Sequence, residues 1–203
     1  MNKDFIIVND YIPNIIIDLR YYSNNNFVGN RIDGYKENYV ILTKEAAKAL
    51  KKANEELLEQ GLCIKIFDAY RPQKAVDYFY KWSKDLNDIK MKNIYYPNIL
   101  KKDLFKKGFI SLKSSHSRGS TIDLTIFDLK TNEELDMGGF FDYFDKSSYI
   151  NYKKLTKEQY NNRLFLNNIM SKYGFKGLNE EWWHYTLINE PFKDIYFDFD
   201  IKK

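Results

Sequence analysis

The sequence predicts a single α+β domain over residues 1–203, in which a small and largely antiparallel sheet is flanked by helices. Helix-like and strand-like segments are mixed along the chain but do not alternate regularly, as they would in a parallel α/β fold. No glycine-rich phosphate loop joins a strand to a helix, which argues against the nucleotide-binding folds. With 203 residues, 44% of them apolar, and no Pro/Gly/Ser-rich linker, the chain can bury one good core.

Three helices are expected, each from a start signal followed by apolar residues at helical spacing. The first follows Thr43, a favourable N-cap, and ends near Gly61. The second begins at Pro72, because proline is favoured at the first helical position. The third follows Thr156, with which Gln159 completes a capping box. The apolar stripes are Ala46, Leu50, Ala53 and Leu57; Ala75, Phe79 and Trp82; and Leu166, Ile169 and Tyr173.

Four strands are expected from short runs of β-branched and aromatic residues. Cys63 lies in one of these runs, so we interpret it as a buried strand residue and not as a nucleophile. Residues 85–108 show no pattern that assigns them to a helix or a strand. The four runs are Asn14–Leu19, Leu62–Tyr70, Thr121–Phe127 and Trp182–Leu187.

Charge and hydropathy argue against several classes of protein. The net charge is only +4 and the basic residues are scattered among acidic ones, so nucleic-acid binding is not expected. The first apolar run is too short for a secretory signal, and no stretch is long enough to span a bilayer, so no membrane partner is expected. A single cysteine cannot form an internal disulfide, which fits a reducing compartment. We therefore expect a soluble, cytoplasmic protein.

The chain has only two histidines, and both lie near carboxylates. His116 occupies a serine-rich turn that leads into the strand carrying Asp123, and His184 closely follows two glutamates. If His116, Asp123 and His184 converge, they form a three-ligand zinc site with a fourth position open for water, as in catalytic zinc sites. Glu180 is an alternative ligand to Asp123. Taken separately, His116 could cap a turn, Asp123 could join a surface ion pair, and His184 could be a hydrogen-bonded core residue.

Glu181 is the candidate general base, but its position relative to His184 requires an irregular strand. Residues three apart face opposite sides of a regular strand, because side chains alternate with a period of two. Both side chains can face one metal ion only if Glu181 lies in the entering loop or at a β-bulge.

Arg71 ends one expected strand and precedes Pro72, which biases its backbone towards an extended conformation. The free N–H groups of the following helix favour anions, and the guanidinium there could stabilise an oxyanion or bind a substrate carboxylate. A structural ion pair with Asp68 is the alternative. Together, zinc-activated water, Glu181 as base and acid, and Arg71 at the oxyanion describe metal-assisted amide hydrolysis.

In their order and spacing, these motifs resemble the zinc D-alanyl-D-alanine dipeptidases of the VanX type. The resemblance extends over nearly the whole chain. Its motifs are Ser114-x-His116-x-x-Gly119-x-x-x-Asp123, Glu181-x-Trp183-His184, Asp68-Ala69-Tyr70-Arg71-Pro72, Asp18-Leu19-Arg20-Tyr21, Asn26-Phe27 through Gly34-Tyr35, and Asp136-Met137-Gly138-Gly139-Phe140-Phe141-Asp142.

The resemblance implies a fold, a cofactor and roles for these residues. The fold would be the α+β zinc-peptidase fold shared with D,D-carboxypeptidases and the Hedgehog signalling domain. One zinc ion per chain would be held by His116, Asp123 and His184, with Glu181 as general base and acid and Arg71 stabilising the transition state. The activity implied is cytoplasmic hydrolysis of free D-Ala-D-Ala, in vancomycin-type resistance or in D-alanine recycling.

A free dipeptide carries an ammonium and a carboxylate, so its enzyme needs an anion at one end and hydrogen-bond donors at the other. By the resemblance, Asp142 and Tyr21 are the candidates for the ammonium end, and Ser114 and Tyr35 for the carboxylate end. Thr121 departs from the pattern, because the family commonly has alanine there. Its additional methyl and hydroxyl groups have to be packed close to the metal site.

Two alternative functions are weighed against the dipeptidase. The first is a D,D-carboxypeptidase or another cell-wall peptidase of the same superfamily, which usually needs an export signal that we do not find in this sequence. The second is a non-catalytic zinc-binding interaction module, which would require neither Glu181 nor Arg71.

Overall fold

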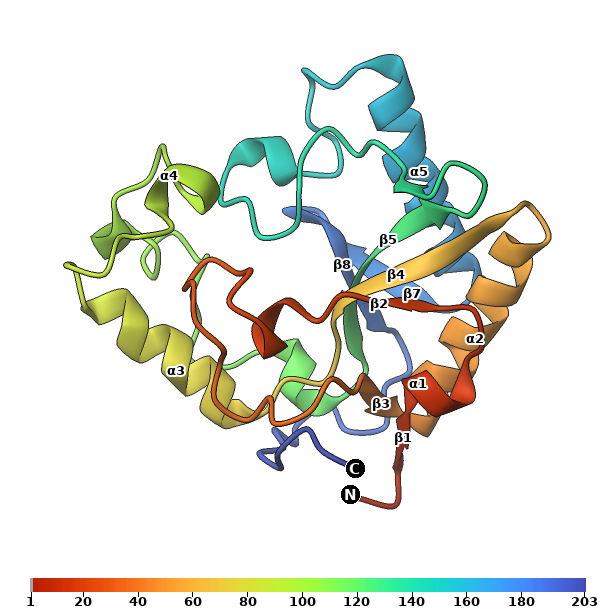
Figure 1. Cartoon of the computed structure of the whole chain (residues 1–203), viewed down its shortest axis with the longest axis horizontal. Coiled ribbons are helices and arrows are strands. Elements are labelled where there is room, and N and C mark those ends of the chain that lie inside the picture. The colour runs from red at the N-terminus through yellow and green to blue at the C-terminus, as the bar shows by residue number, and fades with distance from the viewer. Residues whose placement is uncertain (1) are drawn as a thin grey trace.

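A six-stranded, largely antiparallel sheet forms the centre of the protein in the computed structural model, which describes residues 2–203 (Figure 1). The strand order is β2-β4-β5-β8-β7, and β6 pairs with the end of β5. Strands β2 and β4 run parallel, and the other neighbours are antiparallel. The strands are β2 Ile16–Ile17, β4 Leu62–Asp68, β5 Thr121–Asp128, β6 Glu133–Glu134, β7 Phe175–Leu178 and β8 Glu181–Leu187. The predicted α+β class is confirmed.

A second, two-stranded antiparallel sheet pairs β1 Phe5–Ile7 with β3 Ile41–Thr43. The α-helices are α1 Val8–Tyr11, α2 Lys44–Leu58, α3 Gln73–Lys84, α4 Lys92–Tyr95 and α5 Lys157–Lys172. Four short 3₁₀-helices are η1 Arg20–Tyr22, η2 Lys101–Asp103, η3 Ser115–Arg118 and η4 Lys146–Ser148. Within residues 2–203, no helix combines the length and apolar character needed to cross a bilayer.

The three predicted helices are confirmed, together with the signals that start them. The Thr43 hydroxyl accepts a hydrogen bond from the amide of Ala46 at the start of α2. At the start of α5, Thr156 and Gln159 form the predicted capping box. Pro72 is the N-cap of α3, so that helix begins at Gln73, one residue after the predicted start.

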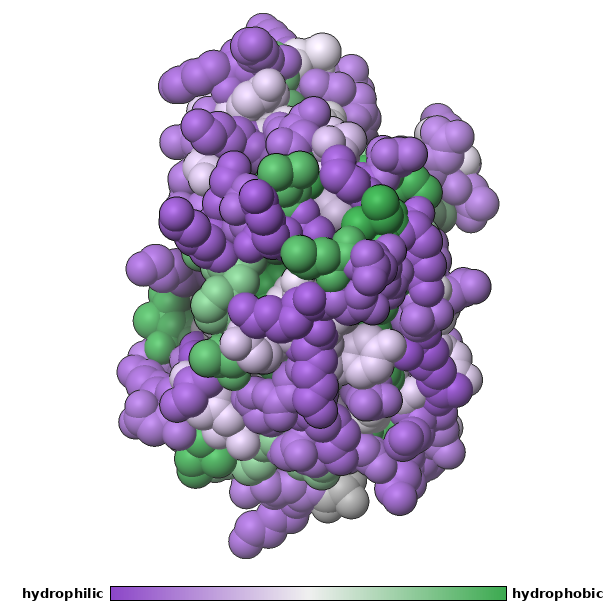
Figure 2. Space-filling model, turned by 90° about the vertical axis from the view of Figure 1, so that its left-hand side faces the viewer, coloured by the Kyte–Doolittle hydropathy of each residue, from purple (hydrophilic) through white to green (hydrophobic). Residues whose placement is uncertain are grey.

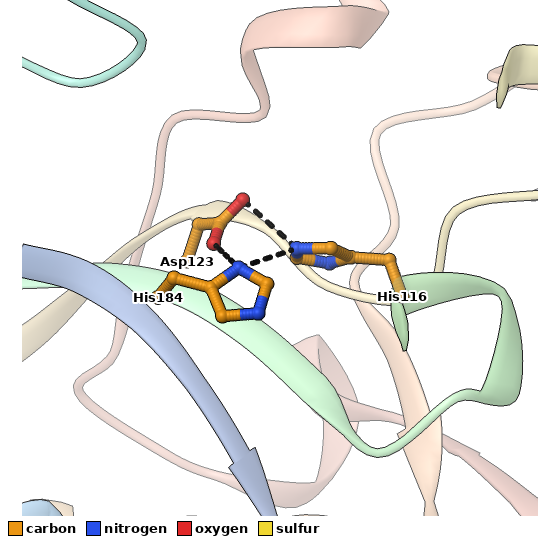
Figure 3. A group of neighbouring side chains, drawn as sticks. All are labelled: His116, Asp123 and His184. Carbon is orange, nitrogen blue, oxygen red and sulfur yellow. Dashed lines mark hydrogen bonds and ion pairs between the residues drawn. The ribbon is translucent and has the colours of Figure 1, made fainter. Parts of the chain in front are cut away.

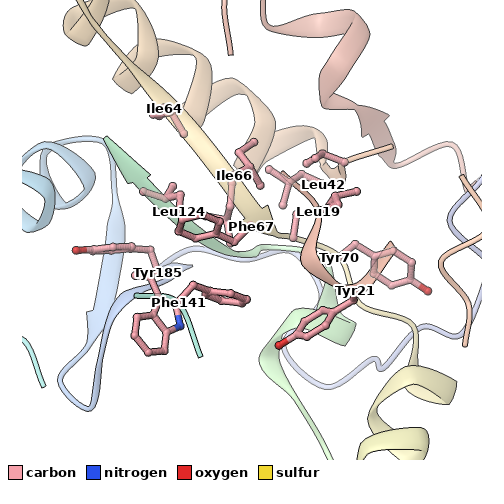
Figure 4. Close-up of a cluster of buried hydrophobic side chains, with 14 of the residues drawn as sticks. Leu19, Tyr21, Leu42, Ile64, Ile66, Phe67, Tyr70, Leu124, Phe141 and Tyr185 are labelled. Carbon is pink, nitrogen blue, oxygen red and sulfur yellow. The ribbon is translucent and has the colours of Figure 1, made fainter. Parts of the chain in front are cut away.

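The two faces of the central sheet carry different residues. Along β5, Ile122, Leu124 and Ile126 alternate with Thr121, Asp123 and Thr125, and all six are buried. Helix α2 contacts β4, while α5 contacts β7 and β8, so these two helices cover one side of the sheet (Figure 1). Figure 4 shows part of the apolar core around β4 and β5, which includes Ile64, Ile66 and Leu124.

Two expected strands are shorter than their sequence patterns. Of the run Asn14–Leu19, only Ile16 and Ile17 pair with β4, and Asn14 has a left-handed backbone with φ of 59°. Strand β4 ends at Asp68, two residues before the predicted end. Cys63 is buried in β4, as predicted.

The segment without a sequence pattern, residues 85–108, forms α4 and η2 and is held by a buried lysine. Lys101 donates to the carbonyl of Asp88 at 2.6 Å, and its ammonium lies 3.8 Å from the ring centroid of Trp82. Figure 2 shows the side of the molecule where α3 and α4 lie: hydrophilic side chains cover most of it and hydrophobic ones form separate groups. Small hydrophobic groups of this kind are ordinary on protein surfaces.

Candidate active site

Three different elements bring the two histidines and Asp123 together. Asp123 on β5 is directly opposite His184 on β8 in the antiparallel register, so both side chains project from the same face. His116 lies in η3, immediately before β5. The hydroxyl of Ser114 caps η3, and Gly119 ends it with a φ of 82°, where an added Cβ would collide with the ring of Phe5.

The side chains of His116, Asp123 and His184 meet at one point (Figure 3). Asp123 Oδ2 lies 3.1 Å from His116 Nε2, and Asp123 Oδ1 lies 3.0 Å from His184 Nδ1. The two ring nitrogens are 3.3 Å apart. Two imidazoles and one carboxylate are therefore close enough to share a single metal ion.

The protonation states of His116 and Asp123 favour binding of a metal ion. His116 Nδ1 donates to the carbonyl of Ala69 at 2.7 Å, and burial lowers the pKa of His116, so Nε2 presents a lone pair to the carboxylate of Asp123. Asp123 Oδ1 is buried without a well-aligned hydrogen bond. Burial alone would raise the pKa of Asp123, but His116 and His184 hold it well below its usual range. The lone pair of His116 Nε2 and the carboxylate of Asp123 therefore face the same point, where a cation would be stabilised, and two nitrogens with one oxygen suit zinc.

Glu181 reaches the same point because β8 is irregular. Gly177 of β7 pairs with Tyr185 of β8, but the next residue, Leu178, pairs with Glu181, so β8 contains extra residues between these two pairs. This shift places Glu181 Oε2 3.5 Å from His184 Nδ1 although the two residues are three apart. Burial raises the pKa of Glu181, whereas 34% of its side-chain surface stays exposed: the carboxylate is deep in the protein but open to a cavity.

Arg71 makes the ion pair considered as its structural alternative and also faces the histidine-aspartate cluster. Its Nε donates to Asp68 Oδ2 at 2.8 Å, and its Nη2 lies 3.5 Å from Asp123 Oδ2. The guanidinium carbon lies 4.9 Å from the ring centroid of Tyr21. Although burial opposes it, the surrounding Tyr21 and Asp68 raise the pKa of Arg71 well above its ordinary value, so this side chain is a fixed cation.

A second sheet irregularity turns Asp68 towards Arg71. Ile66 pairs with Leu124, but Asp68 pairs with Asp123, so β4 has one extra residue at Phe67. On a regular strand Asp68 would share the apolar face of Ile66, whereas the bulge places it on the face of Asp123.

Tyr21 and Asp142 form a hydrogen-bonded pair in the wall of the cavity. The Tyr21 hydroxyl donates to Asp142 Oδ2 at 2.8 Å. Asp142 keeps 7% of its surface exposed, and burial raises its pKa well above the usual range. A carboxylate buried with a neutral partner is strongly stabilised by an added cation.

The structure corrects the expectation for Tyr35. This residue is 1% exposed and does not line the cavity, and its hydroxyl donates to Asp68 Oδ1 at 2.6 Å. Tyr35 therefore supports Asp68, and through it Arg71, and cannot contact a substrate carboxylate. Ser114 does line the cavity, as expected for a substrate contact, while its Oγ also caps η3.

The cavity that contains these groups has a volume of about 560 Å³. Its polar lining is formed by Arg71, His116, Asp123, Glu181 and His184, and it is also lined by Tyr21, Asp142 and residues 108–111 and 113–115. A cavity of this size accommodates a small molecule.

Comparison with known proteins assigns this cavity to a family. A sequence model described as D-Ala-D-Ala dipeptidase matches residues 1–202. The chain belongs to the D-Ala-D-Ala dipeptidase family. D-alanyl-D-alanine dipeptidases of Enterococcus faecalis and of Streptomyces coelicolor are each 40% identical to it over 201 residues, which cover 99% of this chain and all of each relative. The dipeptidase of Escherichia coli is 34% identical over 175 residues, covering 86% of this chain and 80% of that one.

As a member of this dipeptidase family, the protein is an enzyme of the metallopeptidase class. A solved structure of the vancomycin-resistance D,D-pentapeptidase VanY in complex with Zn(II) matches 78% of each chain at 12% identity, with a TM-score of 0.43.

Thr121, which we expected to depart from the dipeptidase pattern, has a partner for its hydroxyl. Its hydroxyl lies 2.9 Å from that of Thr186, its partner across β5 and β8. The pair lies on the site face, two residues from Asp123, so the Thr121 hydroxyl is paired close to the candidate metal ligands.

Sequence reasoning missed one residue that contacts a histidine of the site. Ser115 Oγ lies 3.3 Å from His184 Nε2 and orients that ring. Its position next to His116 was the available signal. Nothing in the sequence indicated that a histidine 69 residues away would be its partner.

Proposed function

We propose that this protein hydrolyses free D-alanyl-D-alanine to two molecules of D-alanine with the help of one zinc ion. The observation that carries the proposal is that a His-Asp-His cluster, a glutamate and a buried Asp142 line one small cavity. The first two features provide hydrolysis, and Asp142 provides a counter-charge for the free ammonium of a dipeptide. The names of the relatives support the same substrate.

His116, Asp123 and His184 would hold the zinc ion. A bound zinc ion lowers the pKa of a coordinated water and polarises the scissile carbonyl. The carbonyl of Ala69 fixes the tautomer of His116, and Ser115 contacts the free nitrogen of His184, so both rings are oriented before the metal arrives.

Glu181 would move the proton. Its carboxylate lies beside the ligand cluster but faces the cavity, where it can accept a proton from the attacking water and then donate it to the departing amine. A pKa raised by burial suits both steps, because the group must accept a proton and release it again. General acid-base catalysis of this kind contributes about 10²- to 10⁴-fold to the rate.

Arg71 would stabilise the negative charge that develops on the carbonyl oxygen. Its guanidinium is held by Asp68, which in turn is held by Tyr35, so the donors are positioned before the substrate binds. Preorganised donors of this kind contribute about 10²- to 10³-fold each.

The two ends of the dipeptide would bind at different walls of the cavity. Asp142 and Tyr21 form the ammonium end, because a buried carboxylate bonded to a neutral hydroxyl is stabilised by a cation. Ser114 offers a hydroxyl to the carboxylate end. The buried, unpaired Cys63 agrees with a reducing compartment, which we propose is the cytoplasm.

The test is the release of D-alanine from free D-Ala-D-Ala by the purified protein, before and after chelation and after zinc is restored. L-Ala-L-Ala and an N-acylated tripeptide ending in D-Ala-D-Ala serve as matched substrates. Zinc-dependent cleavage confined to the free D,D-dipeptide is expected. A preference for the tripeptide would instead indicate a D,D-carboxypeptidase, and zinc binding without hydrolysis would indicate an interaction module.

A further inference from the structure

The segment that presents Asp142 has little regular structure of its own. Residues 136–149, here called the arch, connect β6 towards α5 and contain η4 as their regular element. Asp142 lies near the middle of the arch with a φ of 63°, and the neighbouring Phe141 stacks on Phe67 at 5.0 Å between ring centroids. An irregular segment of this length keeps one conformation only if other contacts offset its conformational entropy.

Arg163, on α5, contacts both ends of the arch. Its Nε donates to the carbonyl of Met137 at 2.7 Å. Its Nη1 donates to the carbonyls of Ser147 and Tyr149 at 2.9 and 2.6 Å. One guanidinium thus ties the two ends of the arch together, with Asp142 between them. A planar group with donors in a fixed fork suits this geometry, which a lysine ammonium cannot reproduce.

Burying this arginine is costly, so its presence needs a physical reason. Arg163 keeps 1% of its surface exposed, and its three acceptors on the arch are uncharged carbonyls. Burial lowers the pKa of Arg163 to about 10. A hydrophobic residue would avoid the desolvation cost but would leave the three carbonyls of the arch without these donors.

Neighbouring residues on α5 extend the same contact. Gln159 Nε2 and Asn162 Nδ2 donate to the side chain and the backbone carbonyl of Asp136, each at 2.9 Å. The guanidinium carbon of Arg163 also lies 5.8 Å from the ring centroid of Trp182, the residue after Glu181. One side of α5 therefore contacts the start and the end of the arch, as well as the irregular part of β8.

We propose that Arg163 is a positioning residue for substrate binding, which holds the arch closed so that Asp142 meets the ammonium of the dipeptide. The inference rests on the proposed function, since it requires Asp142 to bind that ammonium. The metal ligands lie on η3, β5 and β8, outside the arch. Loosening the arch therefore weakens substrate binding while metal binding and the chemical step remain.

The test uses Arg163→Lys and Arg163→Met in the full-length zinc enzyme, with Ile169→Ala as the matched control. Ile169 is also buried on α5 but carries no hydrogen-bonding side chain. Both Arg163 variants should raise the KM for D-Ala-D-Ala by about tenfold or more, with a smaller change in kcat and wild-type zinc content. The control should lower the melting temperature and leave KM unchanged. If Arg163→Met does not fold, Arg163→Lys decides, and a folded variant with wild-type KM overturns the proposal.

A double-mutant cycle with Asp142→Asn tests whether Arg163 acts through Asp142. If it does, Arg163→Lys should add little to the KM of Asp142→Asn. Fully additive effects on KM would show that Arg163 does not act through Asp142.

Amide hydrogen exchange provides a readout that does not depend on turnover. Amide exchange in the arch, residues 136–149, should become faster in Arg163→Lys, while exchange in α2 stays the same, and unchanged exchange of the arch would overturn the proposal. If the wild-type enzyme fails to hydrolyse D-Ala-D-Ala, the proposed function falls, and the exchange measurement still decides whether Arg163 holds the arch.

Discussion

On the side of the sheet where α2 and α5 pack, β5 contributes Ile122, Leu124 and Ile126, and the strands follow their regular alternation. The opposite face carries Asp123 and His184 with Thr121, and both breaks in register lie beside it, at Phe67 in β4 and at the start of β8. Regular pairing is sufficient for burying apolar side chains. An active site needs irregular pairing, because some of its side chains would point to opposite faces of a regular strand and reach the same point only at a bulge.

The two faces also differ in their energetics. Burial of the apolar face stabilises the fold directly through the hydrophobic effect. At the site face, Asp68, Asp123 and Asp142 are buried and the side chain of Arg71 is 13% exposed, and their desolvation costs free energy that ion pairs and hydrogen bonds only partly offset. Changes on the site face should therefore affect activity more than stability, and changes on the apolar face should do the reverse.

The largest expected effect is the loss of kcat when Glu181 on the site face is replaced. Glu181→Gln keeps the shape of the side chain but removes the proton acceptor, so kcat should fall by about 10²- to 10⁴-fold. Zinc content and the melting temperature should stay near wild type, because this carboxylate is neither one of the three ligands nor buried in the apolar core. Steady-state kinetics and metal analysis check this, with Glu180→Gln as the neighbouring control. A Glu181→Gln enzyme with near-normal turnover would remove Glu181 from the mechanism.

Removal of the metal should be the largest stability effect on the site face. Chelation removes the cation that would link His116, Asp123 and His184 and with it the free energy of metal binding to the folded state, so the melting temperature should drop. Zinc at about a thousand times its dissociation constant would stabilise the fold by about 4 kcal/mol. Calorimetry with and without chelator measures the shift. Equal melting temperatures in both samples would show that this cluster does not bind zinc tightly.

A substitution that creates a cavity on the apolar face is expected to have the opposite effect, on stability and not on activity. Leu124 is fully buried between two residues of the site face, Asp123 and Thr125. Leu124→Ala should lower the free energy of unfolding by about 2–5 kcal/mol, through lost burial and the cavity it leaves. KM and kcat should change little at temperatures where the variant is folded. Denaturant unfolding and kinetics on the same preparation check both parts, and a catalytic loss without a stability loss would contradict the division between the faces.

The smallest expected effect concerns Thr121, two residues before the candidate metal ligand Asp123. Thr121→Ala removes the hydroxyl that pairs with Thr186 and should cost about 1 kcal/mol of stability. Since Asp123 is held by the strand and not by this hydroxyl, kcat/KM should change by less than about tenfold, equivalent to 1.4 kcal/mol. Thermal unfolding and kinetics of this variant test how strongly the site depends on packing around its ligands. Loss of zinc on this substitution would show that Thr121 supports the metal site directly.

Local signals in the sequence were sufficient for the three long helices α2, α3 and α5 and for naming the candidate metal ligands. Thr43 and the Thr156-Gln159 box start helices through contacts three residues apart, which are visible in the sequence itself. His116 and His184 stood out because the chain has only two histidines, and each lies near a carboxylate. The need for a bulge near Glu181 also followed from the strand period alone.

The tertiary structure decided which of these residues meet and what supports them. The sequence left open whether Arg71 pairs with Asp68 or faces the active site, and the folded chain does both. Tyr35 was expected in the cavity but lies behind Asp68, and Arg163 had no sequence signal as the residue that holds the arch. Strand register and hydrogen bonds between distant segments set these positions. Such contacts depend on how the whole chain packs, and no local pattern of residues encodes them.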